Sequence, residues 1–490
     1  MTATRVQTET MTRAGDVRHE RDLAAPRDLV GEAAALGRRW ATAGAGGQSR
    51  SERAASERLT RLLADQAGMD LAVRFVDRVV RPDDAVVAAR ELSRLVEGTS
   101  ARAMRTLGAL DRGLLAVGGR LAPRAPRLIV SLARRRLRRL VGGLVVDATG
   151  RTLERQLASL RRPGVRLNLN LLGEAVLGDS EATRRVRRVK ALLRRPDVDY
   201  VSVKASSLVP ARSPWDVEAG AALVFDRLRT LVRAAAGRSP HAFVTLDMEE
   251  YQDLDLTIEA FARVAQDPDL AHVEIGIALQ AYLPDALLAF DRLLALARRR
   301  RASGGARIKV RLVKGANLAM ERVDAELHGW APAPFPTKGD VDASYVRLLD
   351  AALRPDVTEA VRVGVASHNL FHVALAHLLA RARGVAEAVD VEMLHGMAPA
   401  AARLVAEDVG SLVLYTPVVH RGEFDAAIAY LVRRLEEIAA GENFVRALSW
   451  RGRGAGAALD DQERRFVQSV AEMDAVDAQP RRSVPGAAPV

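Results

Sequence analysis

The stretch IKVRLVKGAN, residues 308–317, decides how this sequence folds. Its first six residues form a short apolar and β-branched run, and polar residues gather at and directly after the end of that run. Similar runs recur along the chain, and the segments between them generally have room for a helix. Eight β-α units predict an α/β fold, a (β/α)8 barrel of TIM type, with a doubly wound open sheet as the alternative. The other seven runs are Val165–Leu172, Tyr200–Ser206, Ala242–Met248, Val273–Leu279, Val361–Ala366, Val389–Leu394 and Ser411–Tyr415.

The sequence before the first run has a helical character. Apolar residues recur three and four apart in it, as at Leu59, Leu62 and Leu63, and almost no strand signal is present. We therefore expect a helical arm domain at residues 28–160 and the barrel at residues 161–451. The ends of the chain should be a disordered or flexible N-terminus, residues 1–27, and a linker helix with a tail, residues 452–490.

Composition restricts the function. The 73 Lys and Arg residues exceed the 61 Asp and Glu residues and give a net charge of +12, but only five of the cations are lysines. Much of the charge therefore reflects a bias toward arginine, and we expect no specific nucleic-acid partner. A retained lysine suggests a site that needs a compact point charge. The absence of cysteine excludes disulfides, thiolate catalysis and cysteine-ligated zinc or iron–sulfur sites.

The location of the protein follows from two segments. The first thirty residues contain no apolar run, so we expect no signal peptide and a cytoplasmic protein. Residues 128–140 alternate leucines with a dense run of arginines and predict a basic amphipathic helix. Such a helix could lie on a membrane surface or face solvent. We favour the second interpretation, because the aliphatic parts of the arginine side chains can cover the helix while their charged groups stay in water.

Chemistry in a barrel of this kind is expected at the carboxyl ends of the strands. Lysine and asparagine are scarce in this chain, yet several of them fall at these positions. A metal site is not expected, because His372 and His377 fall in an apolar helix and few other ligands accompany His368. The polar residues expected at this edge are Asn170, Glu174, Lys204, Asp247, Glu249, Glu250, Gln280, Tyr282, Arg311, Lys314, Asn317, Ser367, His368, Asn369, His395 and Tyr415.

A second polar cluster lies on the helix expected after the last strand. In YLVRRLEE, residues 430–437, Tyr430, Arg433, Arg434 and Glu437 lie three or four residues apart and share one face of a helix. Two adjacent arginines can grip a carboxylate through bidentate hydrogen bonds, with Glu437 holding their orientation. A surface ladder of salt bridges is the other interpretation.

Together and in this order, the motifs resemble the proline dehydrogenase family. They are VSVKASSL around Lys204, TLDME around Asp247, LQAY around Gln280, RLVKGA from Arg311, SHN from Ser367, LHGM from Leu394, Tyr415, and YLVRRLEE. More narrowly, the chain is similar to the proline dehydrogenase half of the bacterial bifunctional flavoenzymes that combine proline dehydrogenase with 1-pyrroline-5-carboxylate (glutamate semialdehyde) dehydrogenase.

The resemblance implies a distorted (β/α)8 barrel that binds FAD and oxidises L-proline to 1-pyrroline-5-carboxylate in proline catabolism to glutamate. Electrons would pass to a membrane quinone, with the protein in the cytoplasm or peripheral on the membrane face. A separate 1-pyrroline-5-carboxylate dehydrogenase would be a partner. The implied substrate residues are Lys204, Arg433 and Arg434 for the carboxylate, Tyr415 and Leu394 for the ring, Asp247 beside flavin and proline, Glu174 as a gate paired with Arg433, and Glu437.

The resemblance also implies the cofactor residues. Arg311 would contact flavin N5 and Gln280 the pyrimidine edge. Phe444 would meet the adenine region. The ribose and pyrophosphate would be held by Lys314, Gly315, Thr337, Lys338, Ala366, His368 and Asn369.

Two departures from the family pattern qualify these expectations. Asn317 stands where the family often has tyrosine, which puts substrate affinity in question. The aldehyde dehydrogenase half is absent from this polypeptide, so the chain is either monofunctional or the front part of a split or truncated enzyme. Two alternatives remain: a flavin barrel acting on another cyclic imino acid such as hydroxyproline, which the size of Tyr415 disfavours, and a non-catalytic basic scaffold.

Overall fold

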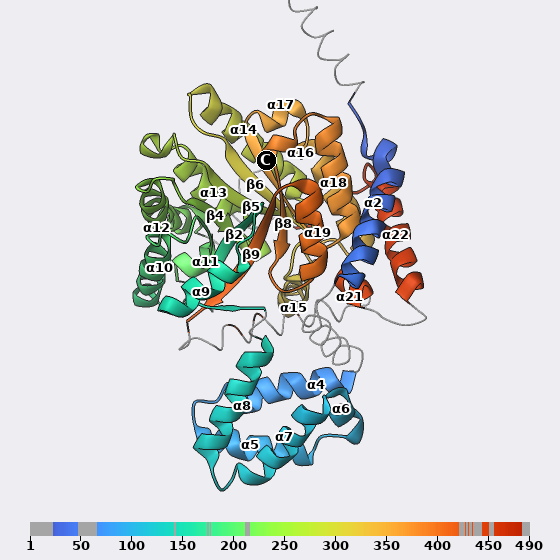
Figure 1. Cartoon of the computed structure of the whole chain (residues 1–490). Helices are drawn as coiled ribbons and strands as arrows, with labels where there is room; N and C mark the ends of the chain where they lie inside the picture. Colours follow the sequence, from blue (N-terminus) through green and yellow to red (C-terminus); the bar gives the residue numbers. More distant parts are fainter. Residues whose placement is uncertain are drawn as a thin grey trace, which may run out of the picture.

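The predicted barrel is confirmed in the computed structural model, which describes residues 23–47, 66–141, 144–173, 176, 178–210, 216–420, 427, 430, 434, 443–449 and 455–482. Eight parallel strands pair in chain order, and β9 closes the ring by pairing with both β8 and β2 (Figure 1). The strands are β2 (Val165–Leu171), β3 (Tyr200–Lys204), β4 (Phe243–Asp247), β5 (Ile275–Gln280), β6 (Ile308–Val313), β7 (Val361–Ala366), β8 (Val389–Leu394) and β9 (Leu412–Val419).

The observed strand bounds differ from the predicted ones in two informative places. The strand that begins at Tyr200 ends at Lys204, because the one-turn helix α11 (Ala205–Leu208) starts directly after it. The last strand continues from Tyr415 to Val419, where the two-residue strand β1 (Val146–Asp147) pairs with it in parallel. Both deviations lie at the carboxyl end of the barrel, where the chain turns toward the expected site.

Helices surround the barrel (Figure 1). Their buried apolar residues share one core with those of the strands. The covering helices include α10 (Asp179–Leu193), α12 (Val217–Ala236), α13 (Leu254–Ala265), α14 (Ala286–Ala302), α16 (Lys338–Ala352), α18 (Leu370–Ala382) and α19 (Pro399–Val409). Shorter elements are α15 (Leu318–His328), α17 (Pro355–Thr358), α21 (Phe444–Ser449) and the 3-10 turns Tyr251–Asp253, Pro268–Leu270 and Ala386–Ala388.

Helices also form a separate layer beyond the barrel end, as the arm prediction expects (Figure 1). Their small core contains Leu71, Val79, Leu92, Leu95 and Val130, apart from the barrel core. Among the described residues, no helix combines the length and the apolar character needed to cross a bilayer. The layer comprises α4 (Gln66–Phe75), a π-helical turn (Val76–Val80), α5 (Ala85–Glu97), α6 (Ala101–Thr106), α7 (Ala109–Leu121) and the arginine-rich α8 (Pro126–Val141).

Both ends of the segment assigned to the arm pack on the barrel. Helix α2 (Pro26–Gly46) lies against α18 and α19, and a Cβ added at Gly37 would come within 2.6 Å of the Phe371 ring. Helix α9 (Gly150–Leu160) buries Leu153 and Leu157 in the barrel core. The C-terminal helix α22 (Ala455–Glu472) packs against α2 and α16. The domain boundaries at residues 28 and 160 stay a prediction.

Candidate active site

Three predicted site residues converge at the carboxyl end of the barrel. Asp247 ends β4, and its carboxylate accepts hydrogen bonds from the Arg311 guanidinium of β6 and from the Tyr415 hydroxyl of β9, the latter at 2.9 Å. The Asn170 amide of β2 donates in turn to the Tyr415 hydroxyl. Burial raises the pKa of Tyr415 well above its usual value, although Arg311 opposes the shift. The tyrosine is therefore a neutral donor that keeps the carboxylate in place.

Lys204 lies beside this cluster, opposite Asp247 in the pairing of β3 with β4. Its ammonium is 2.5 Å from the carboxylate of Glu249, and the backbone carbonyl of Glu249 accepts hydrogen bonds at 3.1 Å from the Gln280 and Asn317 side-chain amides. The sequence pattern predicts Glu249 at this strand end together with Asp247, without a specific role for it.

A cluster of two lysines around one carboxylate lies on the β6–β7 side of the barrel. The ammonium groups of Lys314, which follows β6, and Lys338, which begins α16, both contact the buried carboxylate of Asp342. Burial, together with the charge of Lys338, lowers the pKa of Lys314 to about 7, while Asp342 opposes the shift. His372 also contacts the Lys314 ammonium, at 3.1 Å, and was missed as a site residue. The cluster carries an excess cation that suits a phosphate.

Two helices, α16 and α18, begin next to this lysine cluster. Thr337 caps α16, since its hydroxyl accepts a hydrogen bond from the backbone N–H of Asp340 at 3.1 Å. Asn369 caps α18 by accepting hydrogen bonds from the backbone N–H groups of Phe371 and His372. Helix N-termini favour negative charge through their backbone donors and dipole. Both predicted residues therefore have a capping role that is consistent with anion binding nearby.

His368, which follows β7, and Gln280, which ends β5, each have a buried polar atom at the carboxyl end of the barrel. The Nε2 atom of His368 accepts a hydrogen bond from the backbone N–H of Leu394 at 2.9 Å, which leaves the proton on Nδ1. Burial lowers the pKa of His368 to about 4, with a contribution from Arg434, so the ring is neutral. Within the described part of the chain, neither His368 Nδ1 nor Gln280 Oε1 has a hydrogen-bond partner. Such buried atoms fit a ligand that brings its own polar groups.

Gly315 provides a close backbone approach in the same region. Its φ of +112° is in the region that favours glycine, and an added Cβ would lie 2.4 Å from the Tyr282 ring. Four more predicted residues are described. The Ala366 carbonyl accepts a hydrogen bond from the Tyr345 hydroxyl at 3.3 Å, and Leu394 pairs in register with Tyr415. Phe444 packs edge-on against Phe371, and the Arg434 guanidinium lies over the Tyr430 ring. Glu174, Arg433 and Glu437 lie outside the described residues.

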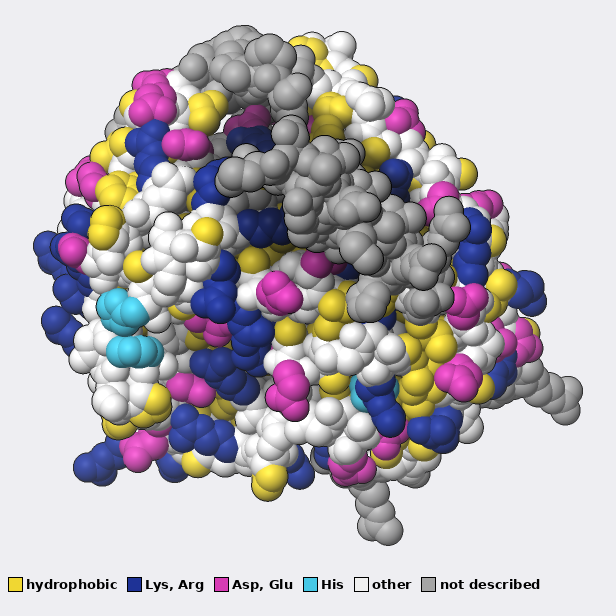
Figure 2. Space-filling view, turned by 90° about the horizontal axis from the view of Figure 1, so that it is seen from above, with side chains coloured by type: hydrophobic (Ala, Val, Ile, Leu, Met, Phe, Trp, Pro, Cys, Tyr) yellow, Lys and Arg dark blue, Asp and Glu magenta, His cyan; other side chains and the backbone are white. Residues whose placement is uncertain are grey.

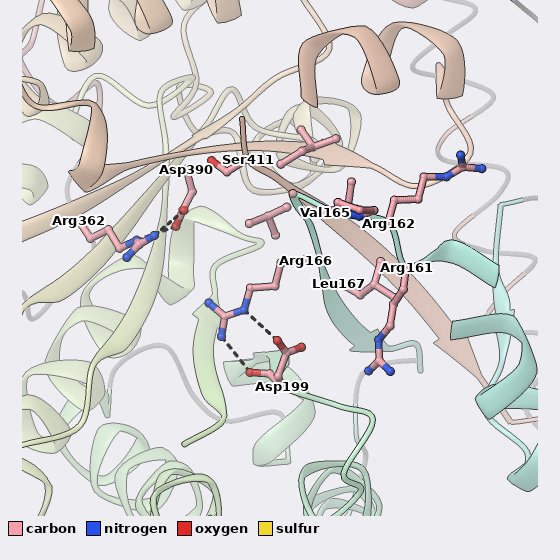
Figure 3. Close-up of a pocket in the computed structure, with 13 residues that line it drawn as sticks. Arg161, Arg162, Val165, Arg166, Leu167, Asp199, Arg362, Asp390 and Ser411 are labelled. Atoms are coloured by element: carbon pink, nitrogen blue, oxygen red, sulfur yellow. Dashed lines mark hydrogen bonds and ion pairs between the residues drawn. The ribbon is translucent and has the colours of Figure 1, made fainter. Parts of the chain in front are cut away.

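A cavity of about 570 Å³ lies at the opposite, amino end of the barrel (Figure 3). Arg161, Arg162, Arg166 and Arg362 line it, and Figure 2 views the molecule from that end, where Lys and Arg side chains gather around a hollow. Arg166 is paired with Asp199 and Arg362 with Asp390. None of the residues predicted for the site lines this cavity. Within the described residues no group of three or more His, Asp or Glu side chains is arranged to hold a metal ion.

Comparisons with known proteins point to one family. A family model described as proline dehydrogenase matches residues 153–447. A solved structure of proline utilization A from Corynebacterium freiburgense is 49% identical, with a TM-score of 0.64 over 77% of this chain and 36% of that one. The bifunctional protein PutA of Escherichia coli is 28% identical over 64% of this chain, which spans only 24% of that relative. The proline dehydrogenase of Deinococcus radiodurans is 27% identical over 55% of this chain and 78% of that protein.

Proposed function

Because the chain belongs to the proline dehydrogenase family, we propose that it oxidises L-proline to 1-pyrroline-5-carboxylate with FAD as cofactor. The observation that carries the proposal is the buried cluster of Asp247, Arg311 and Tyr415 at the carboxyl end of the barrel. In barrels of this type, residues from several strand ends meet at that end to form the active site. Here they come from three strands that are not neighbours in the sequence.

Substrate binding would depend on cations. Lys204, Arg434 and Arg433 would bind the proline carboxylate, because guanidinium groups form bidentate hydrogen bonds with a carboxylate. Glu249 supports this role by holding the Lys204 ammonium at 2.5 Å. Leu394 and Tyr415, adjacent in the β8–β9 register, would form the wall along the pyrrolidine ring. Glu437 would orient the two arginines, and Glu174 would pair with Arg433 as a gate over the bound substrate.

The residues on the β6–β7 side fit a flavin dinucleotide. When bound, FAD supplies the two-electron acceptor for oxidation at the carbon next to the amine. Lys314 and Lys338, with the capped helix starts at Thr337 and Asn369, would hold the pyrophosphate and ribose. The orphaned Gln280 Oε1 would accept from the pyrimidine edge, and His368 Nδ1 would donate to the cofactor. Gly315 and Ala366 would admit the cofactor close to the backbone, and Phe444 would contact the adenine region.

The further steps of the proposed pathway lie outside this chain. Electrons would leave the protein for a membrane quinone, and a separate 1-pyrroline-5-carboxylate dehydrogenase would consume the product. We propose a cytoplasmic location with peripheral contact to the membrane. These partners follow from the family membership, and the chain spans only 24% of the length of the Escherichia coli relative.

An anaerobic titration tests the proposal. The purified protein is loaded with FAD, and L-proline is added without oxygen while flavin absorbance is recorded. We expect the flavin band to bleach with L-proline and to remain unchanged with D-proline. Equal bleaching by hydroxyproline would shift the substrate assignment to another cyclic imino acid. A protein that binds no FAD, or that stays oxidised with every imino acid, would contradict the proposal.

The role of Arg434 is tested by an Arg434→Met variant. Loss of a charge-assisted hydrogen bond of about 1.5–3 kcal/mol should raise the KM for proline roughly tenfold to a hundredfold. FAD affinity should change less than the KM for proline, because the proposed partner of Arg434 is the substrate carboxylate. An unchanged KM in this variant would remove Arg434 from the carboxylate site.

A further inference from the structure

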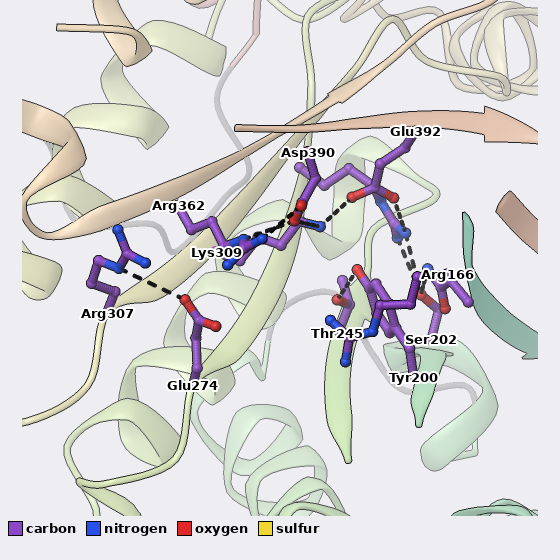
Figure 4. A network of polar contacts seen from close by, with 12 residues as sticks. Arg166, Tyr200, Ser202, Thr245, Glu274, Arg307, Lys309, Arg362, Asp390 and Glu392 are labelled. Carbon is purple, nitrogen blue, oxygen red and sulfur yellow. Dashed lines mark hydrogen bonds and ion pairs between the residues drawn. The ribbon is translucent and has the colours of Figure 1, made fainter. Parts of the chain in front are cut away.

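Charged side chains fill the centre of this barrel, where branched apolar residues are usual. Lys309 and Arg311 of β6 point inward, two residues apart, and so do Asp390 and Glu392 of β8. Lys309 and Glu392 are each only 2% exposed. Figure 4 shows Lys309 reaching from its strand toward both carboxylates of β8. None of Lys309, Asp390 and Glu392 has a part in the proposed reaction.

These side chains form a column of alternating charge along the barrel axis. Arg362 at the amino end binds both carboxylate oxygens of Asp390, at 2.8 and 2.7 Å. The Lys309 ammonium is 2.8 Å from Asp390 and 2.5 Å from Glu392. We call the sequence Arg362, Asp390, Lys309, Glu392, Arg311 and Asp247 the ion-pair column. It joins the cavity at the amino end to the candidate active site.

The two cations next to Glu392 are not equivalent. The Lys309 ammonium lies 2.5 Å from one Glu392 oxygen, whereas the Arg311 guanidinium lies 3.5 Å from the other. Arg311 also donates to the Ser202 hydroxyl at 3.3 Å, which fixes its position without adding charge. Glu392 is therefore bound more closely by Lys309 and offsets less of the charge of Arg311, whose nearest carboxylate is that of Asp247.

The backbone of β7 makes room for the column. A Cβ added at Gly364 would lie 2.6 Å from the Glu392 carboxylate and 2.9 Å from the Lys309 stem. Burial alone would lower the pKa of Lys309, but Glu392 and Asp390 raise it above its usual value, so the side chain is charged. Buried ion pairs are often no more stabilising than apolar residues of the same size. Fold stability alone is therefore a poor explanation for the column.

We propose that Lys309 and Glu392 are positioning residues that set the electrostatic potential which Arg311 presents to the flavin. This inference rests on the proposed function, in which Arg311 contacts flavin N5. Lys309 takes up most of the charge of Glu392, so Glu392 adds little to the negative charge that Asp247 already places on Arg311. A more positive potential at Arg311 favours the reduced, electron-rich flavin. Charge near N5 and N1 is one of the ways in which a protein tunes a flavin.

The test compares the flavin reduction potential of the FAD-loaded wild-type protein with Lys309→Met, Glu392→Gln and the double variant. Potentials are measured anaerobically against a reference dye, with a chemical reductant in place of proline. Lys309→Met should shift the potential to more negative values and Glu392→Gln to more positive values. The flavin potential of the double variant should lie between those of the two single variants and close to that of the wild type. The KM for proline should change less than twofold, since neither residue belongs to the proposed substrate site.

A purely structural role would change FAD affinity in both single variants without opposite shifts in potential. Shifts in the same direction, or none, would overturn the inference. If Lys309→Met fails to fold, Arg362→Gln at the more exposed end supplies the test, with a smaller shift of the same sign as expected for Lys309→Met. If the two single variants shift the flavin potential in opposite directions but L-proline does not reduce the wild-type flavin, only the proposed substrate would be contradicted. A protein that binds no flavin would overturn both proposals.

Discussion

The two ends of the barrel carry similar charges in different surroundings. At the carboxyl end, Arg311 and Asp247 form a buried pair that Tyr415 and Asn170 complete. At the amino end, Arg166 pairs with Asp199, with 39% and 49% of their side chains exposed. The open cavity lies at the amino end, whereas buried charged groups joined by hydrogen bonds lie at the carboxyl end. Functional chemistry here is indicated by charge that is buried and oriented, and a large cavity alone does not locate it.

The difference also explains why the arginine-rich composition is a poor guide to function. An exposed ion pair contributes about 0–1 kcal/mol, because water and salt screen it. A buried pair costs desolvation energy and persists only where its geometry is maintained by neighbours. The predictions below use matched substitutions at the two ends to test this distinction.

The largest effect is expected for Arg311→Met. The variant leaves Asp247 and Glu392 buried with one cation fewer, which should lower the free energy of unfolding by about 3–5 kcal/mol. Oxidation of proline should fall at least a hundredfold, since the proposed contact to the flavin is lost as well. Chemical denaturation and steady-state kinetics provide the two measurements.

Arg166→Met is the matched control at the amino end. Its ion pair with Asp199 is half-exposed, so the free energy of unfolding should change by no more than about 1 kcal/mol. The turnover of proline should be retained. Equal losses of stability in Arg311→Met and Arg166→Met would show that the two ends do not differ as argued.

A second prediction concerns the packing between the two ends. In Gly364→Ala the new methyl group would meet the Glu392 carboxylate and the Lys309 stem, and relief requires a shift of the ion-pair column. We expect a loss of about 1–3 kcal/mol in the free energy of unfolding, as for other overpacked cores. Gly31→Ala in α2 is the control, because a Cβ there meets nothing within 4 Å and alanine favours a helix. A neutral Gly364→Ala would indicate that the centre of the barrel is loosely packed.

The third prediction is a pH dependence of FAD binding. The pKa of Lys314, lowered to about 7 by burial, means that its charged form predominates below that pH and its neutral form above it. Pyrophosphate binding favours the charged form, so above pH 7 binding requires uptake of a proton. The Kd for FAD should then rise by up to about tenfold per pH unit. Fluorescence quenching measures it, and Lys314→Arg should give a flatter profile because guanidinium stays protonated. A flat profile in the wild type would contradict the assignment.

The sequence predicted the barrel well because each strand is a short apolar run bounded by polar residues. The described candidates, such as Asp247, Arg311 and Tyr415, lie together as that pattern requires, while their individual roles stay predictions. The packing of α2 on the barrel was not predicted, since helical periodicity reveals an apolar face and not its partner. The ion-pair column was missed for a related reason. Lys309 and Glu392 lie within runs read as buried strands, and only the closed barrel shows that alternate residues meet across its axis.

The smallest effect is expected at the amino-end cavity, for Arg162→Ala. The side chain is exposed, and within the described part of the structure it forms no hydrogen bond or ion pair. Stability should stay within about 0.5 kcal/mol of the wild type, and kcat, KM and the flavin potential should not change. Arg362→Gln, which borders the same cavity but belongs to the ion-pair column, should shift the flavin potential. If both substitutions, or neither of them, shifted the potential, then membership of the column would not be what connects the amino end to the active site.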